Sequence, residues 1–211
     1  MIGPEKPIMA LKRDILFKDK YFEGFLPASE FDFYSIILAN AEFLDRDYVE
    51  TAQEYKQPVV YFLITNPKGE YFVFRRAVDP TKYREARLRG KYSFAIGGHV
   101  RDKDIKHPKA RNHIEGAILR ELHEEGGLED VNLNNLQLLG YINQDKGVGL
   151  YHFGLAFSLI VSEGQVLKPK DTSVTEYGFK SVEELKKILR DPSYEVEGWS
   201  KILFENVIKK L

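Results

Sequence analysis

From residue 58 onward, segments typical of β-strands alternate with segments typical of capped helices. Val59–Ile64 and Tyr71–Arg76 are β-branched and aromatic runs on either side of a turn at 66–69, Asn-Pro-Lys-Gly, and they predict a hairpin. Further strands are predicted over 92–96, where Gly97 and Gly98 would end the strand, and over 136–141, 151–161 and 175–179. Strands interleaved with helices around one core indicate an α/β fold, an α/β/α sandwich with a mixed sheet.

The helix with the clearest ends is predicted over 113–125. Asn112 is a good N-cap with Glu115 at the third helical position, and Gly126 and Gly127 supply a C-terminal stop. Two later helices are predicted over 181–189, capped by Ser181, and from about 197 to the last residue.

Residues 1–57 have a different character and are expected to form a mainly helical extension to a domain that spans 58–211. Ser29 and Asp32 resemble a capping box for an amphipathic helix over 33–44 that ends near Asp45, and a second short helix is predicted over about 46–55. The apolar face of the first helix needs a partner surface. That partner is either the core or the second subunit of a homodimer.

Composition excludes several classes of protein. The 31 Lys and Arg residues balance 32 Asp and Glu residues, so no global charge attracts nucleic acid or an anionic membrane. With no cysteine, the chain has no disulfides, thiolate zinc sites or cysteine nucleophile. The longest apolar run, Val59–Ile64, has six residues where a membrane helix needs about 20, and the start of the chain shows no signal-peptide core. We expect a cytoplasmic protein with no membrane or nucleic-acid partner.

Three glutamates crowd the end of the 113–125 helix. At about 100° per residue, Glu121, Glu124 and Glu125 project within one arc, while Leu122 points toward the packed side. Like charges at this spacing repel, and the helix dipole disfavours negative charge in the last turn. A hard divalent cation such as Mg²⁺ would relieve both penalties. The alternative interpretation is a solvated acidic helix end.

The segment Arg120–Leu128 resembles the second half of the box of the Nudix hydrolase superfamily. It has the order Arg-Glu-apolar-x-Glu-Glu-x-Gly-apolar, and the strand and glycine pair at 92–98 are similar to those that precede the box helix. The chain departs from the family in two ways. Thirteen residues, 99–111, stand where the family has five, an insertion of eight, and Asn112 occupies the slot of the first box glutamate. A looser resemblance extends over about 58–190.

The resemblance implies an enzyme that hydrolyses a diphosphate linkage in a nucleoside diphosphate derivative. Glu121, Glu124, Glu125 and the Gly97 carbonyl would hold Mg²⁺ or Mn²⁺. Arg120 would orient a ligating glutamate. The general base would come from the box glutamates or from Glu176, which matches a base position of some family members.

Candidate substrate contacts lie outside the box. Arg75 and Arg76, at a strand end, could bind the phosphates, and so could His99; a structural role is the alternative for His99 and for His152. The basic segment from 75 to 91 could also be a solvated loop; its members are Arg75, Arg76, Lys82, Arg84, Arg87, Arg89 and Lys91. Family subgroups for ADP-ribose or dinucleoside polyphosphates carry a proline or tyrosine in the window held here by residues 143–146, Asn-Gln-Asp-Lys. The residues at these positions therefore indicate no particular substrate.

Two other functions remain open. A non-catalytic Nudix-type module could bind a nucleotide or regulate a partner, which the N-terminal segment and Asn112 allow. An isomerase similar to isopentenyl-diphosphate isomerase shares the fold, but those enzymes use an active-site cysteine that this chain lacks.

Overall fold

The computed structural model describes residues 7–83, 85–129 and 131–210. These residues form two compact units. Unit 1 comprises the described residues of Met1–Tyr61 with Gly97–Arg120 and Leu138–Phe157, and unit 2 those of Phe62–Ile96, Glu121–Gln137 and Ser158–Leu211. Five elements contribute residues to both units: β4 (Tyr55–Thr65), β7 (Ile96–His99), α4 (His113–Glu124), β8 (Leu136–Asn143) and β9 (His152–Ile160).

In unit 1 the strands are hydrogen-bonded in the order β4-β9-β8-β2, with β2 at Gly24–Pro27. Gln57 N donates to Tyr151 O at the start of β4 and β9, and in unit 2 Val161 N donates to Thr65 O at their ends, so the two strands run parallel. β2 pairs antiparallel with β8. The sheet is therefore mixed, because it contains both kinds of pairing.

In unit 2 the order is β10-β5-β4, with β5 at Tyr71–Arg76 and β10 at Val174–Lys180. β4 and β5 form the predicted hairpin, joined in register at Thr65 and Tyr71. β4 begins at Tyr55, earlier than expected, and continues through Pro58. The strand predicted over 92–96 is two strands, β6 (Tyr92–Ser93), which pairs with β5, and β7, so the glycine pair lies inside a strand and does not end one.

The predicted box helix is confirmed as α4, and its two ends form as expected. The Asn112 side chain accepts a hydrogen bond from Glu115 N at 3.0 Å. At the other end, Gly127 has φ of +67° and Leu128 N bonds back to Leu122 O at 3.0 Å, a glycine-terminated helix stop. A Cβ at Gly127 would lie 2.1 Å from Lys168 O, so only glycine fits there.

The region before β4 contains strands as well as helices. The expected helix over 33–44 is shorter: α2 (Phe33–Asn40) is capped by Asp32, which accepts from Ser35 N, and β3 (Glu42–Leu44) follows it. The second helix is the single turn α3 (Arg46–Val49). β1 (Ile8–Lys12), which pairs with β3 and β4, and the single turn α1 (Arg13–Leu16) precede them. β1 has five residues and β3 has three, too few for alternation to be recognised, which is why these strands escape a periodicity analysis.

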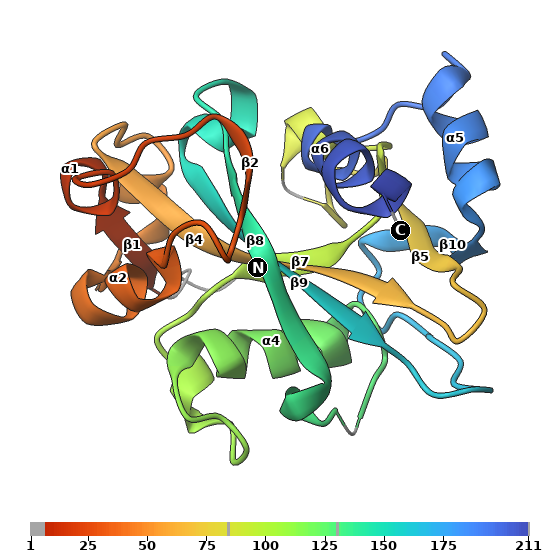
Figure 1. Cartoon of the computed structure of the whole chain (residues 1–211), viewed down its shortest axis with the longest axis horizontal. Helices are drawn as coiled ribbons and strands as arrows, with labels where there is room; N and C mark the ends of the chain where they lie inside the picture. Colours follow the sequence, from red (N-terminus) through yellow and green to blue (C-terminus); the bar gives the residue numbers. More distant parts are fainter. Residues whose placement is uncertain (1–6, 84, 130, 211) are drawn as a thin grey trace. The chain divides into compact units, whose positions relative to one another are not determined.

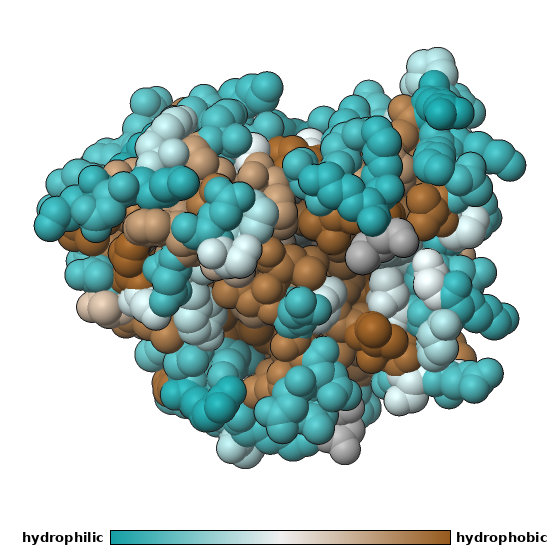
Figure 2. Space-filling model, viewed as in Figure 1, coloured by the Kyte–Doolittle hydropathy of each residue, from teal (hydrophilic) through white to brown (hydrophobic). Residues whose placement is uncertain are grey.

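The late elements agree more closely with expectation. α5 (Val182–Arg190) has the predicted capping box between Ser181 and Glu184, and the side chains drawn over it in Figure 2, at the upper right, are mostly hydrophilic. α6 (Gly198–Asn206) ends earlier than predicted and is followed by the 3₁₀ turn η5 (Ile208–Lys210). Four further 3₁₀ turns are η1 (Ala86–Leu88), η2 (Asp104–Lys106), η3 (Leu133–Asn135) and η4 (Gly147–Leu150). Residues 1–6 of the expected extension, Arg84 of the basic segment and Leu211 lie outside the described residues.

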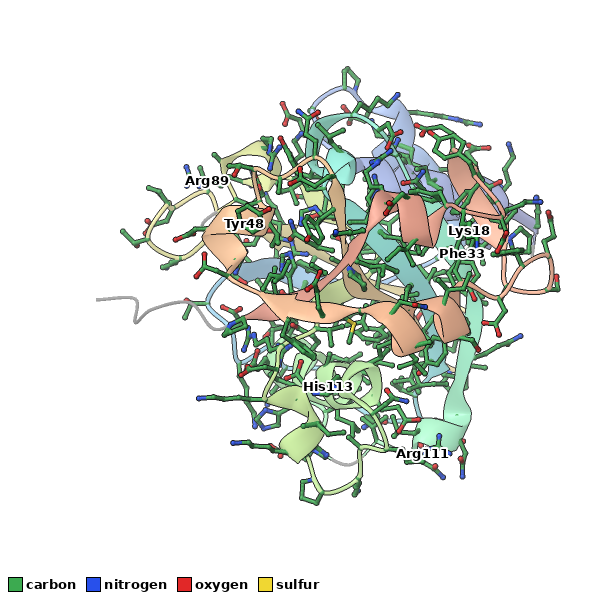
Figure 3. The ribbon with its side chains drawn as sticks, turned by 90° about the vertical axis from the view of Figure 1, so that its left-hand side faces the viewer. Lys18, Phe33, Tyr48, Arg89, Arg111 and His113 are labelled. Carbon is green, nitrogen blue, oxygen red and sulfur yellow. The ribbon has the colours of Figure 1, made fainter. Side chains whose placement is uncertain are left out.

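An aromatic cluster forms the centre of unit 1. Phe33, labelled in Figure 3, is fully buried, and its ring centroid lies 5.2 Å from that of Tyr141 and 5.3 Å from that of Phe153. Phe22 packs against both phenylalanines. The apolar face of α2 thus packs on β8 and β9. The parts of these strands that it contacts belong to unit 1, together with α1, α2 and β1, which are drawn in red and orange in Figure 1. The sequence predicts that the apolar face of this helix packs on the core or on a second subunit, and the structure shows it packed on the core.

Within the part of the chain that the structure describes, no helix has the length and apolarity needed to cross a bilayer.

Replacement of Asn112 by Ala removes the side-chain acceptor at the start of α4. We expect the free energy of unfolding to fall by about 1 kcal/mol, the usual cost of a lost N-cap. Urea unfolding followed by circular dichroism measures this, and Asn134→Ala in the exposed η3 turn serves as a control. An unchanged midpoint for Asn112→Ala would contradict the capping role.

Candidate active site

The glycine pair lies where two strands approach closely. A Cβ on Gly97 would lie 1.9 Å from the carbonyl oxygen of Val60 in β4, within unit 1. Any side chain would force β7 away from β4. The position therefore requires glycine for packing, independently of any role of its carbonyl group.

Arg120, in the third turn of α4, binds the segment that follows the glycine pair. Its Nε donates to Asp104 Oδ1 at 2.8 Å and its Nη2 to Asp104 Oδ2 at 3.1 Å. Nη2 also donates to the carbonyl oxygen of His99 at 2.8 Å. The guanidinium is thus held by a carboxylate and a backbone carbonyl from the lengthened segment 99–111.

The acidic end of α4 is not the solvated surface considered as an alternative. Glu121 and Glu125 are each 5% exposed, Glu124 is half-buried, and Leu122 is fully buried as expected. Buried carboxylates are costly unless they are paired or bind a cation. The energetic conflict predicted from the sequence is therefore larger in the folded chain than on an exposed helix.

Arg76 neutralises part of this negative charge in unit 2. It is 4% exposed; its Nη1 donates to Glu125 Oε1 at 2.8 Å and its Nε donates to Glu197 Oε1 at 3.0 Å. The guanidinium also lies over the rings of Phe74 and Tyr83, at 4.6 and 5.0 Å from their centroids. Burial lowers the pKa of Arg76, but Glu125, Tyr83 and Glu197 outweigh it and hold this pKa well above its usual value. One buried cation is thus shared by two buried carboxylates.

Glu197 is fixed in turn by the strand that precedes the glycine pair. Ser93 Oγ donates to Glu197 Oε2 at 2.9 Å, and Glu197 N donates to Tyr92 O at 3.0 Å. Ser200, in the first turn of α6, accepts a bond from Phe94 N at 2.9 Å. The start of α6 therefore helps to hold Arg76, through Glu197, in its bond with Glu125.

The last carbonyl group of α4 is also compensated. Lys170 N and Asp171 N donate to Glu124 O at 2.9 and 3.0 Å within unit 2. These two N–H groups offset part of the negative end of the helix dipole, next to the acidic side chains.

The glutamates suit a hard cation in their chemistry but are not gathered around one point. Carboxylate oxygens are preferred ligands of Mg²⁺. Among the described residues, no group of three or more His, Asp or Glu side chains could hold a metal ion as placed here. Glu125 directs one oxygen at Arg76, so the expected ligand set is not assembled in this arrangement.

Glu176 forms a second, more exposed cluster in unit 2. Its φ of +47° places it in the left-handed region at a register shift of β10, a conformation that is strained for a residue with a side chain. Its carboxylate accepts from Tyr92 Oη at 2.7 Å and from Arg75 Nη1 at 2.8 Å. These bonds, the tyrosine first, lower the pKa of Glu176. Arg75, unlike Arg76, keeps 35% of its side chain exposed.

His99 lies in a hydrogen-bonded chain in unit 1. Its Nε2 is 2.8 Å from Gln57 Oε1 and 3.0 Å from His152 Nε2, while His152 Nδ1 is 2.7 Å from Val148 O. A carbonyl only accepts, so His152 carries its proton on Nδ1, and the neutral ring accepts at Nε2. Burial, followed by the neighbouring His152, lowers the pKa of His99 well below its usual value. His99 is therefore neutral at pH 7.

Sequence reasoning missed two charged groups at these clusters, Asp104 and Glu197. Asp104 stands in a segment without periodicity, Glu197 stands at the predicted start of the last helix, and neither matches a box position. A buried carboxylate in such a segment has no local signature, because its partner is distant in sequence: 16 residues for Asp104 and Arg120, 121 for Glu197 and Arg76.

Two neighbouring arginines on β5 provide a matched test of these environments. Arg76→Met leaves two buried carboxylates without this partner, and we expect it to lower the free energy of unfolding by about 3–5 kcal/mol. Arg75→Met breaks an exposed pair and should cost no more than about 1 kcal/mol. Equal urea midpoints for the two variants would contradict the shared buried ion pair.

The chain resembles known proteins over most of its length. The model of the NUDIX domain family matches residues 55–198. No curated protein sequence matches the chain. Among solved structures, Tm1382, a candidate Nudix hydrolase, has 28% identity and a TM-score of 0.75, and the match covers 98% of this chain and 100% of that one.

More distant structures share the fold. The NUDIX domain of Shewanella oneidensis NrtR, solved with ADP ribose, has 12% identity and a TM-score of 0.52 over 74% of this chain and 88% of that one. A NUDIX hydrolase from Alicyclobacillus acidocaldarius has 11% identity and a TM-score of 0.58 over 73% of this chain and 91% of that one. The expected α/β fold with a mixed sheet is confirmed, and the match of the family model over most of the chain establishes that it belongs to the Nudix family.

Proposed function

We propose that the chain is an enzyme that hydrolyses a diphosphate linkage in a nucleoside diphosphate derivative. The observation that carries this proposal is the set Arg120, Glu121, Glu124 and Glu125, in the last turns of α4 and directly after it, with two of the carboxylates 5% exposed at the disfavoured end of the helix. A chain that used this helix only for packing would gain stability from apolar residues at those positions. Membership in the Nudix family supports the same conclusion.

The proposal keeps Glu121, Glu124, Glu125 and the Gly97 carbonyl as the groups that would hold Mg²⁺ or Mn²⁺. Such an ion supplies charge neutralisation at the phosphates and acidifies water. In the described arrangement Glu125 is bound by Arg76, so binding a cation requires this carboxylate to turn or to be shared. Glu197 supports that change, because Arg76 stays paired with it when Glu125 leaves.

Arg75 is the better of the two arginines for a phosphate. Its side chain is 35% exposed and its guanidinium reaches the cluster of Glu176 and Tyr92, whereas Arg76 is enclosed by two carboxylates. We assign Arg76 to positioning Glu125 and Arg75 to the phosphate. His99 is neutral, and its one N–H, on Nε2, faces Gln57 and His152, so in this arrangement the ring offers a phosphate neither a donor nor a charge.

Glu176 is the proposed general base outside the box. Its lowered pKa keeps it ionised, and the strained backbone holds its carboxylate against Tyr92 and Arg75. A depressed pKa weakens a base but guarantees that it is unprotonated at neutral pH. The box glutamates remain the alternative source of the base.

ADP-ribose is the first substrate to test, because a NUDIX domain of similar fold was solved with it. Nucleotide sugars, dinucleoside polyphosphates and nucleoside triphosphates complete the screen, each with Mg²⁺ and with Mn²⁺. Ion-exchange chromatography of the products reads turnover directly. Cleavage of any of them establishes an enzyme, and the products name the bond that is broken.

A non-catalytic nucleotide-binding module is the second candidate. Two observations favour it: Asn112 replaces a box glutamate, and the described side chains gather no ligand set for a metal. Such a module would bind a nucleotide in the screen without cleaving it. The homodimer stays a prediction that sedimentation can test.

Replacement of Glu124 by Gln removes one proposed metal ligand and leaves the bond between Arg76 and Glu125 in place. We expect metal-dependent turnover to fall at least about 100-fold, beyond the loss typical of groups that only support a ligand. Glu129→Gln, an exposed glutamate beyond the box, is the control and should keep its activity. Full activity in Glu124→Gln would remove the metal role from this residue.

The pH profile tests Glu176. Its folded pKa is depressed, so its carboxylate stays ionised as the pH falls, and the acidic limb of kcat/KM should lie below the ordinary glutamate value of 4.5. Tyr92→Phe removes the largest cause of the shift and should move this limb to higher pH. If Glu176→Gln shows the same limb as the unchanged chain, the base lies elsewhere.

A further inference from the structure

The lengthened segment 99–111, which contains the insertion, lies directly on the box helix in unit 1. A Cβ on Gly116 of α4 would lie 1.9 Å from the carbonyl oxygen of Asp104 and 2.4 Å from its carbonyl carbon. Only glycine allows this contact between the backbone of the insertion and the helix. Gly116 therefore marks the point where the insertion is seated.

The side chain of Asp104 contacts the same helix one turn beyond Gly116, at Arg120. Gly116 and Arg120 are four residues apart and share one face of α4. The Asp104 side chain, 4% exposed, accepts two bonds from the Arg120 guanidinium and one from Arg101 N at 2.8 Å. Backbone and carboxylate of one residue thus fix the insertion to the helix at two adjacent points.

Arg120 extends this connection to the strand of the glycine pair. Its Nη2 bonds both to Asp104 and to the carbonyl oxygen of His99, the last residue of β7 and the second after Gly97. A guanidinium held in this way has little rotational freedom, because its planar donors already face fixed acceptors. The arginine that precedes Glu121 is therefore bonded directly to β7 at His99 and, through the Asp104 carboxylate, to the segment that follows β7.

Asn112 cannot replace this carboxylate. It is neutral, and its Oδ1 accepts from Glu115 N while its Nδ2 lies 3.4 Å from Tyr34 Oη. The slot that holds a glutamate in the family pattern is used here to cap the helix. The negative charge beside Arg120 comes from Asp104, in the lengthened segment 99–111.

We propose that Asp104 is a positioning residue of the active site, which sets Arg120 and the β7 carbonyl at His99 so that the box groups are held in their working geometry. The inference rests on the proposed function for its effect on turnover. Its structural part concerns only the connection between the insertion, α4 and β7 in unit 1. The segment 99–111 is then a working component of the site, and its Asp104 replaces a missing box residue.

The experiment compares Asp104→Asn, which keeps the shape but removes the charge, with Asp104→Glu, which keeps the charge. Lys106→Gln, an exposed residue of the same 3₁₀ turn η2, is the matched control. Each chain is measured for Mn²⁺ affinity by electron paramagnetic resonance, for kcat and KM with the substrate found in the screen, and for hydrogen exchange of the backbone amides over 97–100.

We expect Asp104→Asn to lose about 10- to 100-fold in Mn²⁺ affinity and in kcat, the range for groups that support a ligand, with KM changed much less. Amide exchange over 97–100 should accelerate, while exchange in the β4-β5 hairpin stays unchanged. Asp104→Glu should recover part of each loss, and Lys106→Gln should behave as the unchanged chain. If Asp104→Asn does not fold, Asp104→Glu is compared with Lys106→Gln. A larger loss of Mn²⁺ affinity and kcat in Asp104→Glu supports the positioning role, and equal values in the two variants overturn it.

Failure of the inference can be told apart from failure of the proposed function. Turnover by the unchanged chain, together with equal kcat, Mn²⁺ affinity and exchange in Asp104→Asn, would overturn the positioning role and leave the function standing. No turnover and no Mn²⁺ binding by the unchanged chain would defeat the function. Exchange over 97–100 then decides alone: acceleration in Asp104→Asn supports the connection, and unchanged exchange overturns it.

Discussion

The ion cluster of Arg76, Glu125 and Glu197 is the interaction on which the acidic end of the box helix depends. Burying Glu125 at the negative end of a helix is unfavourable, and a guanidinium 2.8 Å away is what makes it tolerable. Because Arg76 has a second carboxylate, the cluster keeps an excess of negative charge. That excess is what the proposed metal site would use to attract a cation.

Arginine plays the same physical part in unit 1 with different partners. Arg120 is held by the Asp104 carboxylate and the His99 carbonyl, and both belong to the stretch that is longer than the family pattern. In each unit a planar, permanently charged side chain links segments far apart in sequence. Lysine could not hold two fixed acceptors with the same geometry.

The departures from the family pattern thus have structural accounts. Asn112 caps α4, which any good cap would do, and the charge absent from its slot is supplied by Asp104. The region before β4 supplies Phe22 and Phe33 to the aromatic centre of unit 1, where they pack on Tyr141 and Phe153. Residues that precede the family match at 55–198 therefore support strands that lie within it.

The sequence alone determined the elements whose signals are local: the hairpin of β4 and β5, the ends of α4 at Asn112 and Gly127, the capping box of α5 and the crowding of Glu121, Glu124 and Glu125. Caps, turns and helical spacing act within a few residues, so they can be read without the fold. Only the tertiary structure decided that Glu121 and Glu125 are buried and that Arg76 is enclosed while Arg75 stays exposed. It also decided that Asp104 pairs with Arg120 and Glu197 with Arg76. Burial and long-range ion pairing depend on which segments the folded chain brings together, and no local pattern encodes that choice.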